Sequence, residues 1–249
     1  MPSITSITIT KNNAAGIGKC LDSLQFCDER IVIDSGSTDD TVAIARQKGA
    51  QVVYHDWIGF GPQKNFGLTL ATGDWIFWLD ADEEVTPELA AAVRQAIASG
   101  DANGYRVSRL SWFCGQPMRH SGWHPDYVLR VFRRTMGRWA GGLSHDHVVI
   151  EEPVKRLPGL ILHYPVERLE DAFHKAGYYS TIGAQEMVAS GRRISFMTGI
   201  LRGFFAFFRT YVLQLGFLDG ARGFLLAVVN AEGTYYRYMK AWLAGQRRE

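Results

Sequence analysis

The stretch "WIFWLDADEEVT", residues 75–86, runs from large apolar side chains directly into acidic ones. Its four acids are Asp80, Asp82, Glu83 and Glu84. Thr86 and Pro87 then form a typical helix start, with a threonine N-cap and proline at the first helical position. A buried strand that ends in acids just before a helix is typical of an α/β sheet, in which ligands bind beyond the carboxyl ends of the strands.

The same alternation of strand and helix extends over the first hundred residues. Apolar or alternating runs predict strands at 4–10, 30–34, 51–55 and 74–80, with helical patterns between and after them. This order predicts βαβ units and a mostly parallel sheet with helices on its faces. Two of these strands end in Asp34 and Asp80, so we expect both carboxylates to face one crevice.

Composition narrows the class of protein. A chain of 249 residues that is 47% hydrophobic suits one large domain with or without an appendage. Its three cysteines, Cys20, Cys27 and Cys114, form no C-x-x-C pair, which favours a reducing compartment. The sequence shows neither a secretion signal nor 18 uncharged residues in a row, so we expect no simple transmembrane helix.

Charge is distributed unevenly along the chain. Residues 1–189 carry 18 basic and 22 acidic side chains, whereas residues 190–249 carry 9 and 3. Within this basic tail, Arg202 and Arg209 share one helical face and phenylalanines cover much of the rest. The pattern predicts a helix lying on an anionic membrane surface; the alternatives are a helix packed on the body or in a dimer interface. Long apolar runs disfavour nucleic acid as the partner.

The spacing Asp80-Ala81-Asp82 predicts two carboxylates that point in similar directions. Two hard oxygen ligands in a crevice suit Mg²⁺ or Mn²⁺, which take waters and phosphate oxygens as further ligands. We interpret Glu83 and Glu84 mostly as loop residues that lead into the helix at Pro87. The alternative for Asp34 is a turn or capping residue.

The histidines do not predict a zinc site. His120 and His124 have i, i+4 spacing, but Gly122 and Pro125 argue against a helix there. His163 follows an apolar run, so we expect a packed residue at a strand end; the alternative is contact with a metal ion or a diphosphate.

Several motifs together resemble the family 2 inverting nucleotide-sugar glycosyltransferases, and within them the lipopolysaccharide core (lipooligosaccharide) β-glucosyltransferases. They are "ITITKNN", "VIDSGSTDDT", "GFGPQKNFGLTLATGDWIFWLDADEEVTPEL", "GWHPDYVLRVFRR" and "GFLDGARGFLLAVVNA". The resemblance implies a GT-A, Rossmann-like catalytic domain at 1–189, with a nucleotide-sugar half at 1–103 and an acceptor half at 104–189. Residues 190–249 would form a helical, membrane-associating extension.

The resemblance also assigns candidate residues. Thr10 and Asn12 match the first nucleotide-binding loop, Asp34 the nucleoside contact, and Lys64 a cation near the donor. Asp80 and Asp82 match the D-x-D motif that holds the divalent ion on the diphosphate. The chain departs from its relatives at Asn13, where they commonly have glutamate.

An inverting reaction needs a carboxylate that takes the proton of the acceptor hydroxyl during attack. Asp146 in "SHDHVV" is the favoured base, at a place where relatives carry glutamate. Asp126 in "WHPDY" is the alternative base. Asp126 could instead be a structural acid paired with an arginine of the "RVFRR" run, Arg130, Arg133 or Arg134.

The implied function is transfer of a hexose, first of all glucose, from a UDP-sugar to a lipid-linked oligosaccharide acceptor of the lipopolysaccharide core. The enzyme is then expected in the cytoplasm, peripheral on the inner face of the cytoplasmic membrane. The alternatives are transfer of galactose or N-acetylglucosamine in cell-envelope glycan synthesis, and a non-catalytic nucleotide-sugar-binding scaffold on the membrane. A D-x-D phosphohydrolase is disfavoured because Glu84 stands where that motif has threonine or valine.

Overall fold

The computed structural model describes residues 1–141, 146–192 and 194–246. The chain divides into two compact units, and each is described by itself. Unit 1 comprises Met1–Arg109 and Asp126–His163, and unit 2 comprises Leu110–Pro125 and Tyr164–Glu249. The predicted functional division after residue 189 concerns catalytic and membrane-associating parts and stays a prediction.

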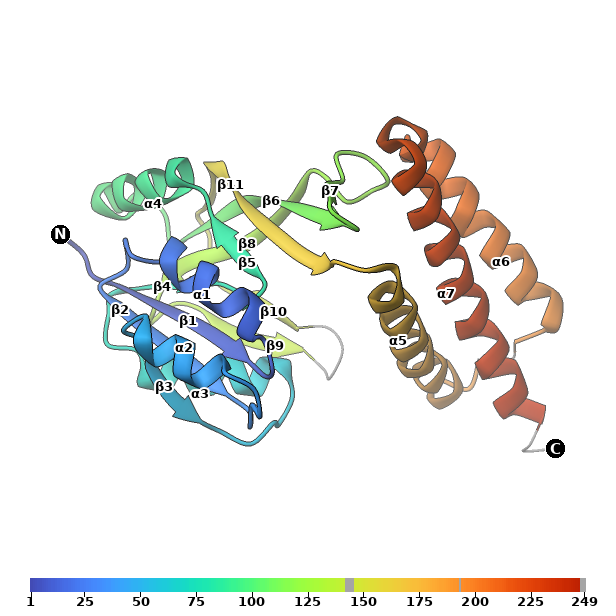
Figure 1. Cartoon of the computed structure of the whole chain (residues 1–249), viewed down its shortest axis with the longest axis horizontal. Helices are drawn as coiled ribbons and strands as arrows, with labels where there is room; N and C mark the ends of the chain where they lie inside the picture. Colours follow the sequence, from blue (N-terminus) through green and yellow to red (C-terminus); the bar gives the residue numbers. More distant parts are fainter. Residues whose placement is uncertain (142–145, 193, 247–249) are drawn as a thin grey trace. The chain divides into compact units, whose positions relative to one another are not determined.

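The elements follow one another as drawn in Figure 1. The strands are β1 (Ile4–Thr10), β2 (Glu29–Asp34), β3 (Gln51–Tyr54), β4 (Trp75–Trp78), β5 (Glu83–Val85), β6 (Gly104–Phe113), β7 (Gln116–Pro117), β8 (Asp126–Arg133), β9 (Arg138–Gly141), β10 (Asp146–Val149) and β11 (Val154–Val166). The helices are α1 (Ala14–Ser23), α2 (Thr41–Gln47), α3 (Phe60–Leu70), α4 (Pro87–Ser99), α5 (Leu169–Ala189), α6 (Phe196–Phe208) and α7 (Gly220–Gln246). A π-helical turn, η1 (Arg209–Leu213), and a 3₁₀ turn, η2 (Gly216–Asp219), join α6 to α7.

The parallel half of the main sheet confirms the four strands predicted in the first eighty residues. β1 pairs in parallel with β2 and β4, and β2 pairs in parallel with β3. Thr10 lies opposite Asp34 in this register, so β1 and β2 end at the same edge. The sheet therefore brings the segments that follow β1, β2 and β4 to one edge.

The other half of the sheet is antiparallel. In the described part of the chain the strand order is β3-β2-β1-β4-β8-β6-β11-β5, with β7 paired to β6. Its strands include the two longest of the described chain, since β6 has ten residues and β11 has thirteen. β11 continues through Pro158-Gly159 because Gly159 takes a φ of +87° against the first turn of α4, where a Cβ would lie 2.5 Å from the Leu89 nitrogen.

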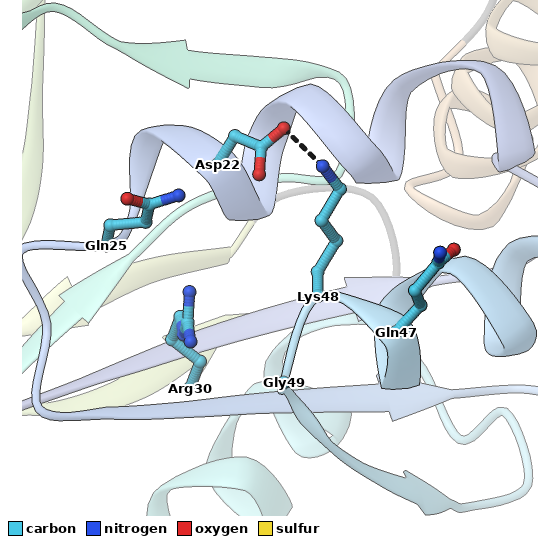
Figure 2. Close-up of a pocket in the computed structure, with 6 residues that line it drawn as sticks. All are labelled: Asp22, Gln25, Arg30, Gln47, Lys48 and Gly49. Carbon is cyan, nitrogen blue, oxygen red and sulfur yellow. Dashed lines mark hydrogen bonds and ion pairs between the residues drawn. The ribbon is translucent and has the colours of Figure 1, made fainter.

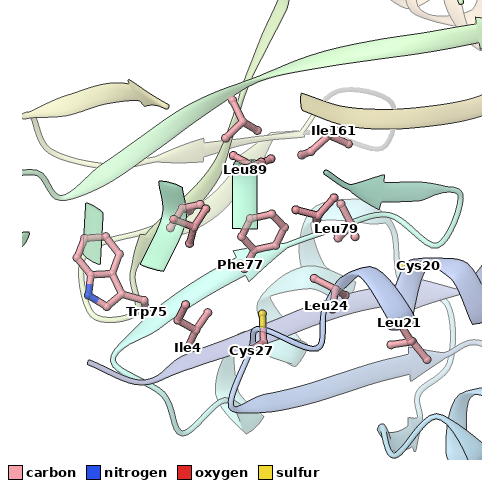
Figure 3. Packing of buried hydrophobic residues seen from close by; sticks show 14 of the residues in the cluster. Ile4, Cys20, Leu21, Leu24, Cys27, Trp75, Phe77, Leu79, Leu89 and Ile161 are labelled. Carbon is pink, nitrogen blue, oxygen red and sulfur yellow. The ribbon is translucent and has the colours of Figure 1, made fainter. Parts of the chain in front are cut away.

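Both faces of this sheet are covered by apolar layers. Residues of α1, α2 and α4 pack on one face, in the cluster that contains Phe77 and Leu79. Figure 3 shows Cys20 and Leu21 of α1 and Leu89 of α4 in this cluster. On the other face, α3 and the β9–β10 hairpin pack over Ile76 and Trp78. Consecutive residues of β4 thus face opposite layers, which explains why "WIFWL" is apolar at every position.

The start of α4 confirms the predicted cap, whereas the acids before it differ from prediction. Thr86 Oγ1 accepts from the backbone nitrogen of Leu89 at 3.4 Å, and Pro87 begins the helix. Our interpretation of Glu83 as a loop residue was wrong. Glu83 lies in strand β5, opposite His163 of β11, and its side chain is fully buried.

Unit 2 confirms the predicted helical tail. α6 and α7 run side by side in Figure 1, and Gly199 and Gly203 of α6 lie on their contact. Arg202 is exposed on α6, whereas Arg209 opens the π-helical turn rather than continuing the helix.

Two glycines inside helices differ in how closely their surroundings approach, and substitutions at them test how tightly α3 packs on the sheet. A Cβ on Gly67 of α3 would lie 2.6 Å from Cγ2 of Ile7, whereas a Cβ on Gly177 of α5 would meet nothing within 4 Å. We predict that Gly67→Ala lowers the free energy of unfolding by about 1–3 kcal/mol through overpacking. Gly177→Ala should instead raise it by up to about 1 kcal/mol through helix propensity. Urea denaturation measures both, and equal effects would contradict the close approach of α3 to β1.

Candidate functional site

The loops after β1 and β2 are joined by hydrogen bonds. Asn12 Oδ1 accepts from the backbone nitrogen of Thr38 at 2.8 Å, and the Asn12 nitrogen donates to Ser37 Oγ at 2.8 Å. Asn12 adopts a φ of 53°, a left-handed conformation that asparagine tolerates. Asn13 caps α1 by accepting from the Gly16 nitrogen, so its departure from the family pattern serves the helix.

Asp34 is a buried turn residue in this structure. Its Oδ2 accepts from the backbone nitrogens of Gly36 and Ser37, at 2.9 and 3.0 Å, and its Oδ1 accepts from Ser37 Oγ. This is the arrangement of the alternative given above, a turn residue. The predicted contact between Asp34 and a nucleoside stays a prediction.

Thr10 and Lys64 lie at the same edge with different surroundings. Thr10 ends β1, and its buried Oγ1 has no hydrogen-bond partner among the residues that the structure describes. Lys64 on α3 is 8% exposed, and its Nζ lies 4.6 Å from the ring centroid of Trp78. A buried cation beside the end of β4 favours negative charge at this edge.

The segment Asp80-Ala81-Asp82 lies directly beyond β4 and packs against helix α1. The Asp80 carbonyl accepts from the Glu83 nitrogen at 3.0 Å, which closes a turn, and lies 3.5 Å from Cys20 Sγ. A Cβ on Gly16 would meet the Ala81 carbonyl at 2.8 Å, so α1 packs closely beneath the loop. The carboxylates of Asp80 and Asp82 remain partly exposed, at 30% and 34%.

A chain of five charged side chains fixes this loop. Arg130 Nη2 donates to Asp80 Oδ2 at 2.9 Å and to Glu83 Oε1 at 2.6 Å. Arg109 Nη1 donates to the same Glu83 oxygen at 3.3 Å. Arg109 also holds Asp126 Oδ2 with two hydrogen bonds, at 2.9 and 2.7 Å. The carboxylates and guanidinium groups therefore alternate from Asp80 to Asp126.

These contacts set the protonation of the group. Burial alone would raise the pKa of Asp80, but the charges of Arg130 and Lys64 outweigh it and lower the pKa well below its ordinary value. Burial raises the pKa of Glu83, and the charge of Arg130 opposes that rise. Since the folded pKa of Asp80 is depressed, its pairing contributes stability above about pH 4, which is lost as the pH falls further.

His163 lies in β11 and faces the D-x-D loop. Its Nε2 is 3.6 Å from Asp82 Oδ2, and its side chain is 16% exposed. The structure thus brings His163 to the carboxylate predicted to hold a metal ion. Within the described residues, however, no group of three or more histidine, cysteine, aspartate or glutamate side chains is arranged to hold a metal ion.

The structure describes the side chain of only one of the two candidate bases, Asp126. Asp126 begins β8 and pairs with Arg109, which is none of the three arginines predicted as its structural partners. The backbone of Asp146 begins β10 and lies opposite Gly141, but its side chain lies outside the described residues. Both assignments stay predictions.

A surface pocket of about 520 Å³ lies elsewhere in unit 1 (Figure 2). The Lys48–Asp22 ion pair, at 2.6 Å, crosses it, and Arg30 lies at the start of β2 beside it. The pocket is therefore at the amino end of β2, opposite the edge that carries Asp34 and Asp80. We assign it no part in the candidate site.

Sequence reasoning missed the three buried or half-buried partners in the charged chain, Arg130, Glu83 and Arg109. One signal was present in the sequence. Arg130 interrupts the apolar run "YVLRVF", and an arginine inside a buried strand needs an acidic partner. The sequence does not say which acid that is.

We predict that Arg130→Met lowers the free energy of unfolding by about 3–5 kcal/mol because it leaves the buried Glu83 carboxylate undercompensated. The matched control is Lys155→Met, which removes an ion pair to Asp101 whose two side chains are each 50% exposed. That change should cost less than about 1 kcal/mol. Adding Glu83→Gln to Arg130→Met should recover part of the loss. Equal costs for the two single variants in urea denaturation would contradict this account.

Comparison with known proteins places the chain in a family. The family model described as glycosyl transferase family 2 matches residues 5–150. The lipopolysaccharide core biosynthesis glycosyltransferase LpsC of Rhizobium meliloti is 30% identical, over 94% of this chain and 93% of its own. An uncharacterized glycosyltransferase of Rickettsia felis is also 30% identical, over 96% of this chain and 89% of its own.

A solved structure aligns with part of the chain. It is glucosyl-3-phosphoglycerate synthase from Mycobacterium tuberculosis in complex with Mn²⁺, UDP and glucosyl-3-phosphoglycerate, 27% identical over 45% of this chain and 44% of that one, with a TM-score of 0.38. The family assignment rests on the family model and on the similarity to LpsC, each of which covers more than half of the chain. The predicted family and the predicted GT-A fold are confirmed: the chain belongs to glycosyl transferase family 2 and is a glycosyltransferase.

Proposed function

We propose that the enzyme transfers a hexose, glucose in the first place, from a UDP-sugar to a core sugar of lipopolysaccharide or lipooligosaccharide, with inversion. The observation that carries the proposal is the grouping of Asp80, Asp82 and Lys64 beyond β4, at the edge where β1 and β2 also end. This edge is where an open α/β sheet binds its ligand. The acceptor class is supported by the similarity to LpsC, which acts in lipopolysaccharide core biosynthesis by its name.

The residues present fit a divalent cation of the Mg²⁺ or Mn²⁺ type. Asp82 and His163 lie 3.6 Å apart and are partly exposed, with Asp80 on the same loop. One or two protein ligands suit an ion that keeps waters and takes phosphate oxygens for the rest of its shell. When bound, such an ion would stabilise the negative charge that develops on the leaving diphosphate.

The chain's own residues supply the remaining electrostatics. Lys64 places a second positive charge beside Asp80, where it would favour the diphosphate of the donor. Arg130 and Glu83 hold Asp80 in one position, so the site is ordered before the donor binds. Preorganised charge of this kind lowers the barrier because nothing has to reorient during the reaction.

Removal of the acceptor proton is assigned to Asp146. Arg109 holds Asp126 Oδ2 in an ion pair, so Asp126 could accept a proton only at Oδ1 or by breaking that pair. The ion pair of Asp126 with Arg109 and the family resemblance both favour Asp146 as the base. Attack by the acceptor hydroxyl on the face opposite the diphosphate then gives a β-linked product from an α-linked donor.

We predict that Asp82→Asn lowers UDP release from UDP-glucose in the presence of Mn²⁺ by at least about a hundredfold, because it removes one charge from the diphosphate site. The control is Asp22→Asn, which alters an exposed carboxylate at the opposite edge of the sheet and should keep full activity. The same assay run with UDP-galactose and UDP-N-acetylglucosamine identifies the donor. Full activity of Asp82→Asn would overturn the proposed role of the D-x-D loop.

We predict that Asp146→Asn lowers kcat by about a hundredfold or more, since general base catalysis contributes that much, while UDP affinity measured by calorimetry stays unchanged. Asp126→Asn should lower kcat by less than about tenfold. The opposite ranking would make Asp126 the base. A non-catalytic scaffold would show no turnover in the unaltered enzyme with any acceptor.

A further inference from the structure

The connection between α6 and α7 exposes apolar side chains where a helix connection is usually polar. Val212, Leu213, Leu215, Phe217 and Leu218 are 40%, 58%, 44%, 47% and 56% exposed. We call these five residues the apolar apex. Loops that face water carry polar side chains as a rule, so this composition indicates an environment other than water.

The exposure of the apex is fixed by its own hydrogen bonds. Asp219 is 4% exposed, and its carboxylate accepts from the backbone nitrogens of Arg119 and His120 and from Ser121 Oγ. The Gln214 carbonyl accepts from the Ser121 nitrogen at 2.8 Å. Polar groups at the apex are thus used inside unit 2, and the apolar side chains are left outside.

Several backbone groups of the apex are also paired internally. The nitrogen of Gln214 donates to the Arg209 carbonyl, that of Leu215 to Val212, and that of Leu218 to Leu215. Internal pairing of backbone groups is the condition for placing irregular backbone in hydrocarbon, where no water can replace a missing partner.

The outer face of α6 continues the apolar surface. Gly199, Gly203 and Ala206 are buried; a Cβ on Gly203 would lie 3.1 Å from Cβ of Tyr235 on α7. The exposed residues of α6 include Leu201, Phe204, Phe205 and Phe208, at 61%, 72%, 50% and 39%. The small residues therefore serve the contact with α7, and the large ones face away from it.

Basic side chains beside the apolar apex indicate which kind of partner covers it. Arg202 and Arg209 are exposed, and so is Arg222, whose guanidinium donates to the Cys114 carbonyl and to Gln116 Oε1. Asp219, the one acid in the sequence from 190 to 231, is buried. A second copy bound through this face by two-fold symmetry would bring like-charged arginines together. Anionic lipid head groups complement them, with the aromatic side chains at the acyl boundary.

Length bears on how deeply this surface can enter a bilayer. Among the described residues no single helix is long and apolar enough to cross a membrane; Phe196–Leu213 and Gly216–Gln246, bent by 71°, pass that test only as a pair. An amphipathic surface with arginines along its border suits partial immersion, with the apolar side roughly 5–10 Å deep in the interface.

We propose that the apolar apex and the outer face of α6 embed in the surface of an anionic bilayer, with Arg202 and Arg209 at the level of the phosphates. The inference deepens the proposed function, since a lipid-linked acceptor would lie in the same bilayer on its cytoplasmic side. It is tested without measuring sugar transfer, so either proposal can fail alone.

The test is flotation of the full chain with phosphatidylcholine vesicles that contain phosphatidylglycerol. The unaltered protein should float, and the variant Leu213→Ser/Phe217→Ser/Leu218→Ser should partition at least about tenfold less. The matched control is Phe173→Ser/Tyr178→Ser on α5, whose side chains are 48% and 62% exposed, and it should float like the unaltered protein. Circular dichroism checks that all variants keep their helices.

A second arm separates head-group recognition from apolar insertion. Arg202→Gln/Arg209→Gln should lower binding to anionic vesicles several-fold and leave binding to pure phosphatidylcholine unchanged. Failure of the unaltered protein to float, or equal flotation of the apex variant, would overturn the proposal. So would a light-scattering result in which the apex variant converts a dimer to a monomer without changing vesicle binding. UDP release by the apex variant with a water-soluble acceptor reports separately on the transferase.

Discussion

The ion pair between Glu83 and Arg130 is the constraint on which the arrangement of the site depends. The chain leaves β4 after Trp78 and enters the sheet again as β5, on the far side of β8, β6 and β11. The D-x-D segment therefore lies in the short turn between β4 and β5, and β5 pairs with β11 instead of β4. A fully buried carboxylate at the start of β5 is tolerable only when it is paired. Arg130 from β8 and Arg109 from β6 provide that pairing.

The pairing links folding to the state of the candidate site. Asp80 shares Arg130 with Glu83, so the guanidinium that compensates the buried acid also holds the exposed one. A buried ion pair is weak support for stability by itself, because an apolar replacement often stabilises as well. An apolar replacement at position 130 would leave Asp80 without its hydrogen bond. The pair is therefore better explained by the position it gives Asp80 than by the stability it adds.

The parallel half of the fold could be predicted because local patterns specify it. Strands of four to seven residues alternate with helices there, and acids or turn residues follow the strand ends. The charged chain could not be predicted in the same way, because its partners lie up to 50 residues apart and meet only through antiparallel pairing. Glu83 looks like a loop acid in sequence; it is buried because β11 lies beside it. Position in the sheet, rather than residue type, decided its role.

The tail shows the same division between local pattern and tertiary position. The helices could be predicted from periodicity. The sequence "GFLDGARGF" alone, however, did not indicate why glycine and aspartate stand at its positions. In the structure Gly216 and Gly223 leave no room for a side chain, since a Cβ would lie 2.6 Å from the Thr210 carbonyl and 1.9 Å from the Gly216 carbonyl. Asp219 between them holds residues 119–121. The motif thus closes a tight, hydrogen-bonded turn whose remaining side chains are apolar, and a turn so constrained cannot fold them inward. An apolar surface that the fold itself cannot cover needs a partner outside the chain, and the exposed arginines beside it, Arg202 and Arg209, favour a lipid head group over a second protein surface.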